Sequence, residues 1–528
     1  MNKAAGVKPG WLATWRSRAL GMAVVLAGLW SCVPVLAHAF AFADVVDQAR
    51  TLAAERYVAP VRSAPESLTA IDYATYQSLR HKPEAWIWRD SATPFRIELH
   101  HVGMQYSAPV ELNIIDSAGG TPVRYDPAQF DFGTLAFDPA TLDGSGIAGF
   151  QVRFPASGPE SRDSIASFLG ASYFHMLGAG QVPGTTARGL AVDTGLASGE
   201  QFPWFRKFWL MRPGAGDKHL TLFALLDSPG VTGAYRFVIH PGAETAVEVR
   251  AQLFFRNAVG KLGLAPLTSM FLYGGGAGLA PPDAQLRPEV HDADGLAIVT
   301  ASGERIWRPL NNPRRLAISA FRLDNPRGFG LLQRAREFNR YDDLEQRFDL
   351  RPSVWVEPQG DWGPGHVELV EIPSQDETND NVVVFWVPAT QPAPGEALNL
   401  AYRLLWSTQG VADSPALAVV RQTRRAPGSA RGNDMSRKPD GTVKLHVDFA
   451  GEVLRKLPDG AVVTVDLSHG GNAEILQSEL KRHPVYQGYR LVLRVKPVDT
   501  TKPVELRARL LHDNQPVSEV WSYQIPNG

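Results

Sequence analysis

Thr245-Ala246-Val247-Glu248-Val249-Arg250-Ala251-Gln252-Leu253-Phe254-Phe255 is the stretch that decides the fold class. From Val247 to Phe255, every second side chain is apolar, and most of those between are charged or polar. Successive side chains of a strand point to opposite faces of a sheet. A period of two therefore predicts an antiparallel strand with one buried and one solvated face.

Similar signals recur along the chain. Short runs of β-branched and aromatic residues alternate with turn residues, and the chain contains 48 Gly and 40 Pro. Neither a βαβ rhythm of about 30 residues nor a fixed repeat is present. We therefore predict an all-β fold. The strands expected in the first half are 95–99, 110–115, 149–154, 206–211, 220–226 and 234–239.

The N-terminus indicates export. Arg16 and Arg18 precede an apolar run at 19–36, and Ala37-His38-Ala39 supplies the small residues that a signal peptidase reads. We expect a cleavable signal peptide over 1–39. Paired arginines are absent, which favours the general secretory route over the twin-arginine route. The only cysteine, Cys32, lies in this segment, so the mature protein is expected to have no disulfide and no thiolate metal site.

Two helices are expected near the start of the mature chain. Residues 44–57 (DVVDQARTLAAERY) have the apolar spacing of an amphipathic helix, with Asp44 as its N-cap. Residues 68–80 predict a second, short helix.

A domain boundary is expected after Trp406. Residues 407–438 combine Pro, Gly and Ser with five arginines, which is typical of a solvated linker. Beyond it, strand-like runs at 443–449, 461–467, 486–495, 504–511 and 517–524 suit an immunoglobulin-like sandwich without its disulfide. We thus predict a large β-sandwich over 40–406, a linker over 407–438, and a small sandwich over 439–528.

The charge balance and the aromatic content limit the kinds of ligand that this protein is expected to bind. Lys and Arg total 53 against 54 Asp and Glu, a balance that argues against nucleic acid as a partner. The 13 tryptophans are more numerous than usual, and an indole face can stack on a pyranose ring. Trp362 lies between turn residues and is our candidate for an exposed platform in substrate binding, whereas Trp386 lies in a strand and is expected in the core.

Two acidic segments carry the chemistry. Asp376-Glu377-Thr378-Asn379-Asp380-Asn381 places three carboxylates in a short loop between strand-like runs 367–372 and 382–387. Their repulsion must be relieved by solvent, by a cation, or by a raised pKa that lets one carboxyl donate a proton. The second segment, EVHDADG at 289–295, offers Asp292 and Asp294 as partners across the fold.

Three interpretations of these segments remain open from the residues alone. They are solvated loops, acid/base catalysis of the glycosidase type, or a calcium site. Asp-x-Asp-Gly matches only a fragment of a calcium loop, and Thr300 stands where further ligands would be needed. No phosphate-binding loop, serine-nucleophile elbow or zinc helix is present, so we expect no cofactor, while the calcium interpretation stays open at this point.

Several blocks, in order along the chain, resemble one family, the periplasmic glucan biosynthesis proteins G and D. The blocks are FLGASYF (168–174), ARGLA (187–191), GEQFP (199–203), EVHDADGL (289–296), WRPLNNP (307–313), RPSVWVEP (351–358) and DETNDNVVVFW (376–386). The resemblance runs from about residue 44 to the end of the chain, and the unpaired signal arginines are more like protein G.

The resemblance implies a galactose-mutarotase-like β-sandwich with a glucan groove, plus an immunoglobulin-like domain. It implies a role in making osmoregulated periplasmic glucans, whose backbone is β-1,2-linked glucose. Some relatives are inverting glycoside hydrolases or transglycosylases. By that analogy Asp380 is the general acid, Asp292 is the base acting through waters, and Glu377 supports them.

Other implied roles concern substrate binding and partners, and the resemblance implies no cofactor and no bound metal. Tyr173 and Arg188 would line the groove, with Asp294 nearby. The implied alternative to an enzyme is a non-catalytic factor that hands glucan to a membrane-bound synthase. The chain departs from the family pattern at Phe348, where a tyrosine is expected, and at Gln181-Val182-Pro183-Gly184, which lacks the tyrosine expected before the glycine. These departures put activity in more doubt than fold.

Overall fold

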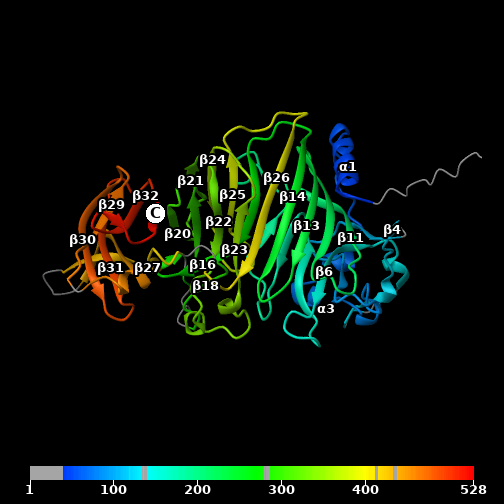
Figure 1. The fold of residues 1–528 in the computed structure, drawn as a ribbon, viewed down its shortest axis with the longest axis horizontal. Coiled ribbons are helices and arrows are strands. Elements are labelled where there is room, and N and C mark those ends of the chain that lie inside the picture. Colours follow the sequence, from blue (N-terminus) through cyan, green and yellow to red (C-terminus); the bar gives the residue numbers. More distant parts are fainter. Residues whose placement is uncertain are drawn as a thin grey trace, which may run out of the picture. The chain divides into compact units, whose positions relative to one another are not determined.

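Two large β-sheets packed face to face form most of the protein in the computed structural model (Figure 1). The structure describes residues 40–527, except 118, 134, 136–138, 279, 281–285, 411–413, 432–436 and 459. The predicted signal peptide therefore lies outside the described residues. No described helix is long and apolar enough to cross a membrane.

The first sheet has 10 strands among the described residues. Their order is β2 (Arg96–His101), β6 (Ile147–Phe154), β7 (Asp163–Leu169), β8 (Tyr173–Met176), β9 (Thr186–Arg188), β15 (Leu262–Ser269), β25 (Val382–Pro388), β24 (Gly365–Glu371) and β21 (Ala317–Leu323), with β10 (Ala191–Val192) paired to β15.

The second sheet has 15 described strands. Their order is β29 (Val463–His469), β32 (Val504–His512), β34 (Val520–Ile525), β20 (Arg305–Pro309), β19 (Gly295–Thr300), β22 (Pro326–Leu332), β23 (Ser353–Pro358), β26 (Ala397–Ser407), β14 (Thr245–Phe255), β13 (Val231–His240), β12 (Leu220–Asp227), β11 (Trp204–Met211), β3 (Glu111–Asp116) and β4 (Gly119–Pro122), with β33 (Gln515–Pro516) paired to β32.

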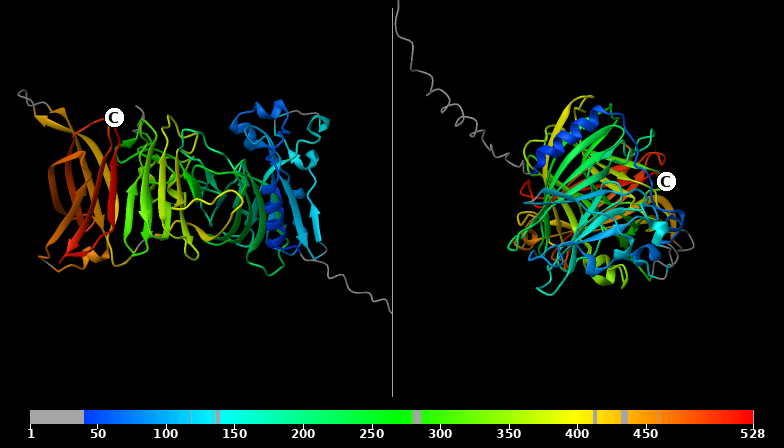
Figure 2. Two further views of the ribbon diagram at one scale, coloured as in Figure 1. Left: turned by 90° about the horizontal axis from the view of Figure 1, so that it is seen from above. Right: turned by 90° about the vertical axis from the view of Figure 1, so that its right-hand side faces the viewer.

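The all-β prediction is confirmed, and β14 has the bounds expected from its alternation. Val247, Val249 and Leu253 are buried in the core between the sheets, whereas Glu248 is exposed on the other face. Phe254 breaks the alternation, and the structure gives the reason. The helix α1 (Phe42–Ala54) packs on the outer face of β12, β13 and β14, so that Phe254 is buried too (Figures 1 and 2).

Helix α1 begins two residues before the predicted cap. Its N-cap is Ala41, and Asp44 is the third helical residue, whose carboxylate accepts a hydrogen bond from the Ala41 amide at 2.7 Å. The prediction of Asp44 as N-cap is therefore wrong. Phe42 stacks on Phe223 with ring centroids 6.2 Å apart, and this contact anchors the first turn on the sheet.

Smaller elements occur along the chain between Glu66 and Leu350. They are α2 (Glu66–Thr69), α3 (Tyr73–Ser78), the pair β1 (Arg80–His81) and β5 (Phe130–Asp131), the 3-10 turns η1 (Pro83–Ala85), η2 (Pro127–Gln129), η3 (Pro139–Leu142), η4 (Phe338–Arg340) and η5 (Phe348–Leu350), and the three-stranded sheet β17 (Ala277–Gly278), β16 (Phe271–Gly274) and β18 (Val290–His291).

The C-terminal strands form a second, smaller sandwich. Its four-stranded sheet has the order β27 (Val419–Arg431), β28 (Arg437–Ala450), β31 (Gly488–Pro497) and β30 (Ala473–His483), and α4 (Glu452–Arg455) follows β28. Strands β29, β32 and β34 form the facing sheet and share its core. They also continue the large sheet, because β34 pairs in parallel with β20.

The expected linker, 407–438, thus contributes β27 to this sandwich. Residues from Ala41 onward form one compact unit.

Candidate active site

The two acidic segments meet at the short connection between β15 and β16. The Asp292 amide donates to the Met270 carbonyl at 2.8 Å, and the Asn381 amide donates to the Ser269 carbonyl at 3.0 Å. The Asn381 side chain accepts from the Phe271 amide at 2.8 Å and donates to its carbonyl at 3.0 Å. One piece of backbone therefore holds Asp292 and the residue after Asp380 side by side.

Asp380 combines exposure with a strongly shifted pKa. Its side chain is accessible to solvent, so a substrate can reach it. Desolvation by the protein atoms around it, followed by the negative charge of Asp292, raises its pKa to about 7, although Arg351 and Arg188 oppose the shift. A carboxyl with this pKa holds its proton for part of the time at neutral pH and can act as a general acid.

Asp292 is buried and carries an ion pair. Arg351 Nη1 donates to its Oδ1, and both side chains are mostly buried. Desolvation nevertheless raises the pKa of Asp292, opposed chiefly by Arg351. Asp292 and Asp380 are close enough for the charge of the first to shift the pKa of the second. When the pKa values of two neighbouring carboxyls are pushed apart in this way, one can serve as the acid and the other as the base.

Arg351 is fixed from three sides. Its Nη2 donates to Gln346 Oε1 at 2.9 Å, and its guanidinium lies 4.2 Å from the centroid of the Phe348 ring. Its aliphatic part fills the space that a side chain at 184 would need, since a Cβ on Gly184 would lie 2.9–3.2 Å from three Arg351 carbons. Gly184 therefore permits the Arg351 position. Phe348 is buried under Arg351, and its ring has no hydroxyl that could reach the acidic pair.

Tyr173 and Arg188 lie together on neighbouring strands near Asp380. They are paired in register on β8 and β9, and the Arg188 guanidinium lies between the Tyr173 and Phe202 rings, 5.1 and 5.2 Å from their centroids. Arg188 also forms an ion pair with Glu200. Desolvation raises the pKa of Tyr173, and Asp380 adds to the shift. Phe202 is 55% exposed, so this stack presents an aromatic face to solvent.

The comparison with known proteins identifies a family. The family model described as "Periplasmic glucan biosynthesis protein, MdoG" matches residues 40–525. The chain belongs to this family. It is similar to glucans biosynthesis protein G of Pseudomonas aeruginosa, with 48% identity over 515 residues, which cover 96% of this chain and 97% of the relative.

A second relative gives the same result, since glucans biosynthesis protein G of Sodalis glossinidius is 49% identical over 489 residues, 92% of this chain and 93% of the relative. Membership of the periplasmic glucan biosynthesis family gives the chain a role in glucan biosynthesis.

In this member of the glucan biosynthesis family, Glu377 is held by a cation. Arg287 binds its two carboxylate oxygens at 3.1 and 2.6 Å, and the Nε of Arg287 contacts Asp343 at 2.8 Å. The Arg287 guanidinium also lies 5.7 Å from the centroid of the Phe348 ring. The charge of Glu377 still contributes to the raised pKa of Asp292, so it lies near the acidic pair without contacting Asp292.

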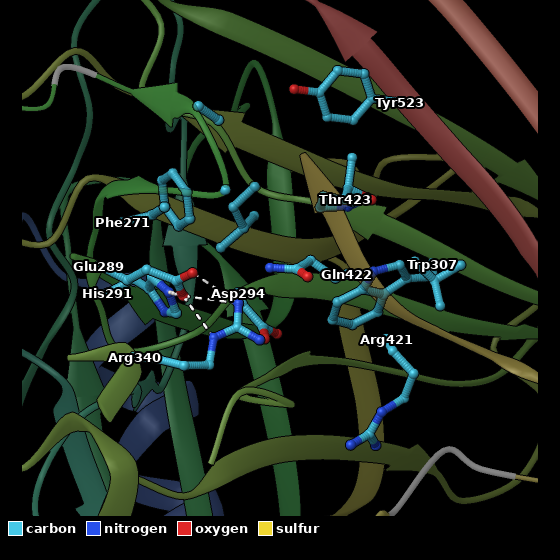
Figure 3. Close-up of a pocket in the computed structure, with 16 residues that line it drawn as sticks. Phe271, Glu289, His291, Asp294, Trp307, Arg340, Arg421, Gln422, Thr423 and Tyr523 are labelled. Atoms are coloured by element: carbon cyan, nitrogen blue, oxygen red, sulfur yellow. Dashed lines mark hydrogen bonds and ion pairs between the residues drawn. The ribbon is translucent and has the colours of Figure 1, made fainter. Parts of the chain in front are cut away.

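Asp294 faces a different environment from Asp292. Its carboxylate accepts hydrogen bonds from the amides of Arg334, at 3.1 Å, and Ala335, at 2.9 Å. It lines a cavity with Glu289, His291 and Arg340, which Figure 3 shows, and neither Asp292 nor Asp380 lines that cavity. The structure therefore places Asp294 as an anchor of the backbone that follows β22.

Trp362 lies far from Asp380. It precedes β24, whereas the acidic loop follows that strand, and seven extended residues span about 20 Å. Its indole Nε1 donates to the Ala401 carbonyl at 3.3 Å, and its ring packs edge-on against Tyr402. Its half-buried side chain belongs to the sandwich core, and Trp386 is fully buried there as expected.

Sequence reasoning did not single out Arg351 or Tyr106. Arg351 lies at the acidic pair because it is bonded to Asp292. Tyr106 lies near the pair because Asp380 contributes to the raised pKa of its phenol, whose main cause is desolvation. Arg351 opens the quoted RPSVWVEP block, but its ion-pair partner is 59 residues away, and no local pattern marks such a pairing. Among the described residues, no group of three or more His, Cys, Asp or Glu side chains could hold a metal ion.

Proposed function

We propose that this protein is a periplasmic enzyme that cleaves or transfers β-1,2-linked glucan with inversion, after export by a cleavable signal peptide. The observation that carries the proposal is the Asp380 carboxyl, which is accessible to solvent and has a pKa of about 7 beside a second carboxyl. Family membership supports glucan as the substrate class.

In the proposed reaction, Asp380 gives its proton to the glycosidic oxygen as the bond from that oxygen to the anomeric carbon breaks. A water, or a sugar hydroxyl in the transfer reaction, attacks the anomeric carbon from the opposite face and loses its proton towards Asp292. Asp292 is buried and paired with Arg351, so the proton would pass through intervening waters. Arg351 would stabilise the carboxylate form of the base.

Binding would use the aromatic and cationic wall beside Asp380. Tyr173 and Phe202 offer ring faces for sugar stacking, and Arg188 lies between them. The buried Nε of Arg188 has no hydrogen-bond partner in the described part of the chain. This donor lies inside the wall and not on its solvent face, because Arg188 is only 2% exposed.

The second candidate is a glucan-binding factor that passes its ligand to a membrane-bound synthase. Phe348 favours it, because a ring without a hydroxyl cannot take part in a proton relay. The direct pairing of Asp292 with Arg351 also favours it, because the pair lowers the basicity of Asp292. This candidate uses the same wall of Tyr173, Arg188 and Phe202 but needs no proton on Asp380.

The test is product analysis after incubating purified protein with linear β-1,2-glucan. Asp380→Asn keeps the shape of the side chain but cannot supply a proton, so turnover should be lost while glucan binding persists. Asp376→Asn is the matched control, because Asp376 lies in the same loop and its pKa is lowered by hydrogen bonds from Thr378. Equal turnover in Asp380→Asn and the wild type would refute the acid role, and binding without turnover by the wild type would support the hand-over factor.

A further inference from the structure

Two adjoining cavities lie where the C-terminal sandwich meets the β16–β17 hairpin. The smaller, of about 50 Å³, is the one in Figure 3, and the larger has about 380 Å³. Gly275, Glu289 and Gln422 line both. A volume of a few hundred Å³ is in the range of small-molecule sites.

The β16–β17 hairpin makes a close backbone contact with strand β27 of the C-terminal sandwich. The Arg425 amide donates to the Gly275 carbonyl at 2.8 Å. Gly275 and Gly276 have φ of +59° and +84°, and a Cβ on Gly276 would overlap the Arg425 carbonyl oxygen. The hairpin turn therefore needs glycine both for its backbone conformation and for its close approach to β27.

The larger cavity is lined by cations without carboxylate partners. Arg424 and Ala426 on β27 lie opposite His446 and Lys444 on β28, so these side chains share one face of the sheet. In the part of the chain that the structure describes, neither Arg424 nor Lys444 forms an ion pair.

Arg425 also lines this cavity, near Tyr523. The carboxylate among the lining residues is Glu289, which is already matched by Arg340 at 2.8 Å and by His291 at 3.1 Å. The cavity thus has an excess of positive charge, and like charges that converge on one concave surface concentrate anions there.

We propose that this cavity binds a phosphate group, either free or as the ester of a small sugar. A phosphate presents several acceptor oxygens and up to two negative charges, which match a fork-shaped arginine and a lysine on neighbouring strands. The volume exceeds that of the phosphate alone and leaves room for the sugar to which it is esterified. The site is separate from the acidic pair, because neither Asp292 nor Asp380 lines it.

The test is calorimetric titration of the full mature chain at low salt with three probes: glucose 6-phosphate, inorganic phosphate and glucose. We expect saturable binding of one or both phosphates and none of glucose. Tighter binding of glucose 6-phosphate identifies an ester as the preferred source, and equal binding identifies free phosphate. Arg424→Gln combined with Lys444→Gln should weaken binding at least about tenfold, because two charge-assisted contacts are lost.

The matched control is Lys496→Gln, since Lys496 is also exposed on the same sheet but does not line the cavity. It should bind as the wild type does, and added salt should weaken binding in both proteins. Arg424 and Lys444 are exposed, and unchanged thermal unfolding of the double variant will verify its fold. Unchanged binding by the folded double variant, or no saturable phosphate binding by the wild type, would overturn the proposal.

Discussion

Replacing Arg351 by glutamine should cost far more stability than removing an exposed arginine. The side chains of Arg351 and Asp292 are 11% and 6% exposed, so the substitution leaves a buried carboxylate without its cation. Breaking a buried pair in this way costs roughly 3–5 kcal/mol. Protonation of Asp292 relieves part of that cost, and we expect Arg351→Gln to lower the free energy of unfolding by about 3 kcal/mol near pH 8.

The loss of stability in Arg351→Gln should become smaller as the pH falls. Arg351 opposes the upward shift of the Asp292 pKa, so its removal raises that pKa further. A carboxyl whose folded-state pKa lies above its unfolded value stabilises the fold fully below the unfolded pKa, and this contribution is lost as the pH rises through the folded pKa. The variant therefore approaches the wild type as the pH falls towards the ordinary aspartate pKa of about 3.9 and departs from it as the pH rises.

Urea unfolding at several pH values measures this difference. Arg403→Gln is the control, because Arg403 and Glu357 are 41% and 36% exposed, and such a pair contributes about 0–1 kcal/mol. In the double variant with Asp292→Asn, the cost of Arg351→Gln should fall by about 2 kcal/mol, since no charge is then left unpaired. A cost below about 1 kcal/mol at pH 8, or one that does not change with pH, would refute the reasoning.

Three further outcomes follow from the same geometry. Turnover should decline about tenfold per pH unit above roughly pH 7, because Asp380 must carry a proton, and a pH–rate profile measures this. Gly184→Ala should destabilise the fold by about 1–3 kcal/mol and reduce turnover, because its Cβ displaces Arg351; thermal unfolding and product assays test both effects. Trp362→Ala should cost roughly 2–3 kcal/mol of stability while leaving the affinity for short β-1,2-glucans unchanged in calorimetric titration, because this half-buried ring packs in the core about 20 Å from Asp380.

Local pattern predicted the strands well where it was strong. The alternation in β14 gave both ends of the strand, and the runs around β12 and β32 were placed within one residue. The arginine-rich segment that forms β27 was expected as a linker, because its sequence has no regular alternation of apolar and polar residues that would indicate a strand with one buried face. Its pairing with β28 comes from tertiary structure.

Only part of the candidate active site could be predicted from the sequence. From the residues, Asp292 and Asp294 were expected to meet the Asp376–Asp380 loop, and the family resemblance singled out Asp380 and Asp292. The structure brings these two segments together through the backbone at Met270 and Phe271. The Arg351 partner, the Gly184 contact and the separate environment of Asp294 depend on packing between distant segments.

The most direct test of the central claim is the titration of the Asp380 carboxyl itself, followed by carbon-13 NMR in protein labelled at aspartate and assigned with Asp380→Asn. We predict a pKa of about 7 that falls in Asp292→Asn, because removal of the neighbouring negative charge makes ionisation easier. A pKa near the ordinary aspartate value of about 3.9, or one that does not respond to Asp292→Asn, would contradict the assignment of Asp380 as the proton donor.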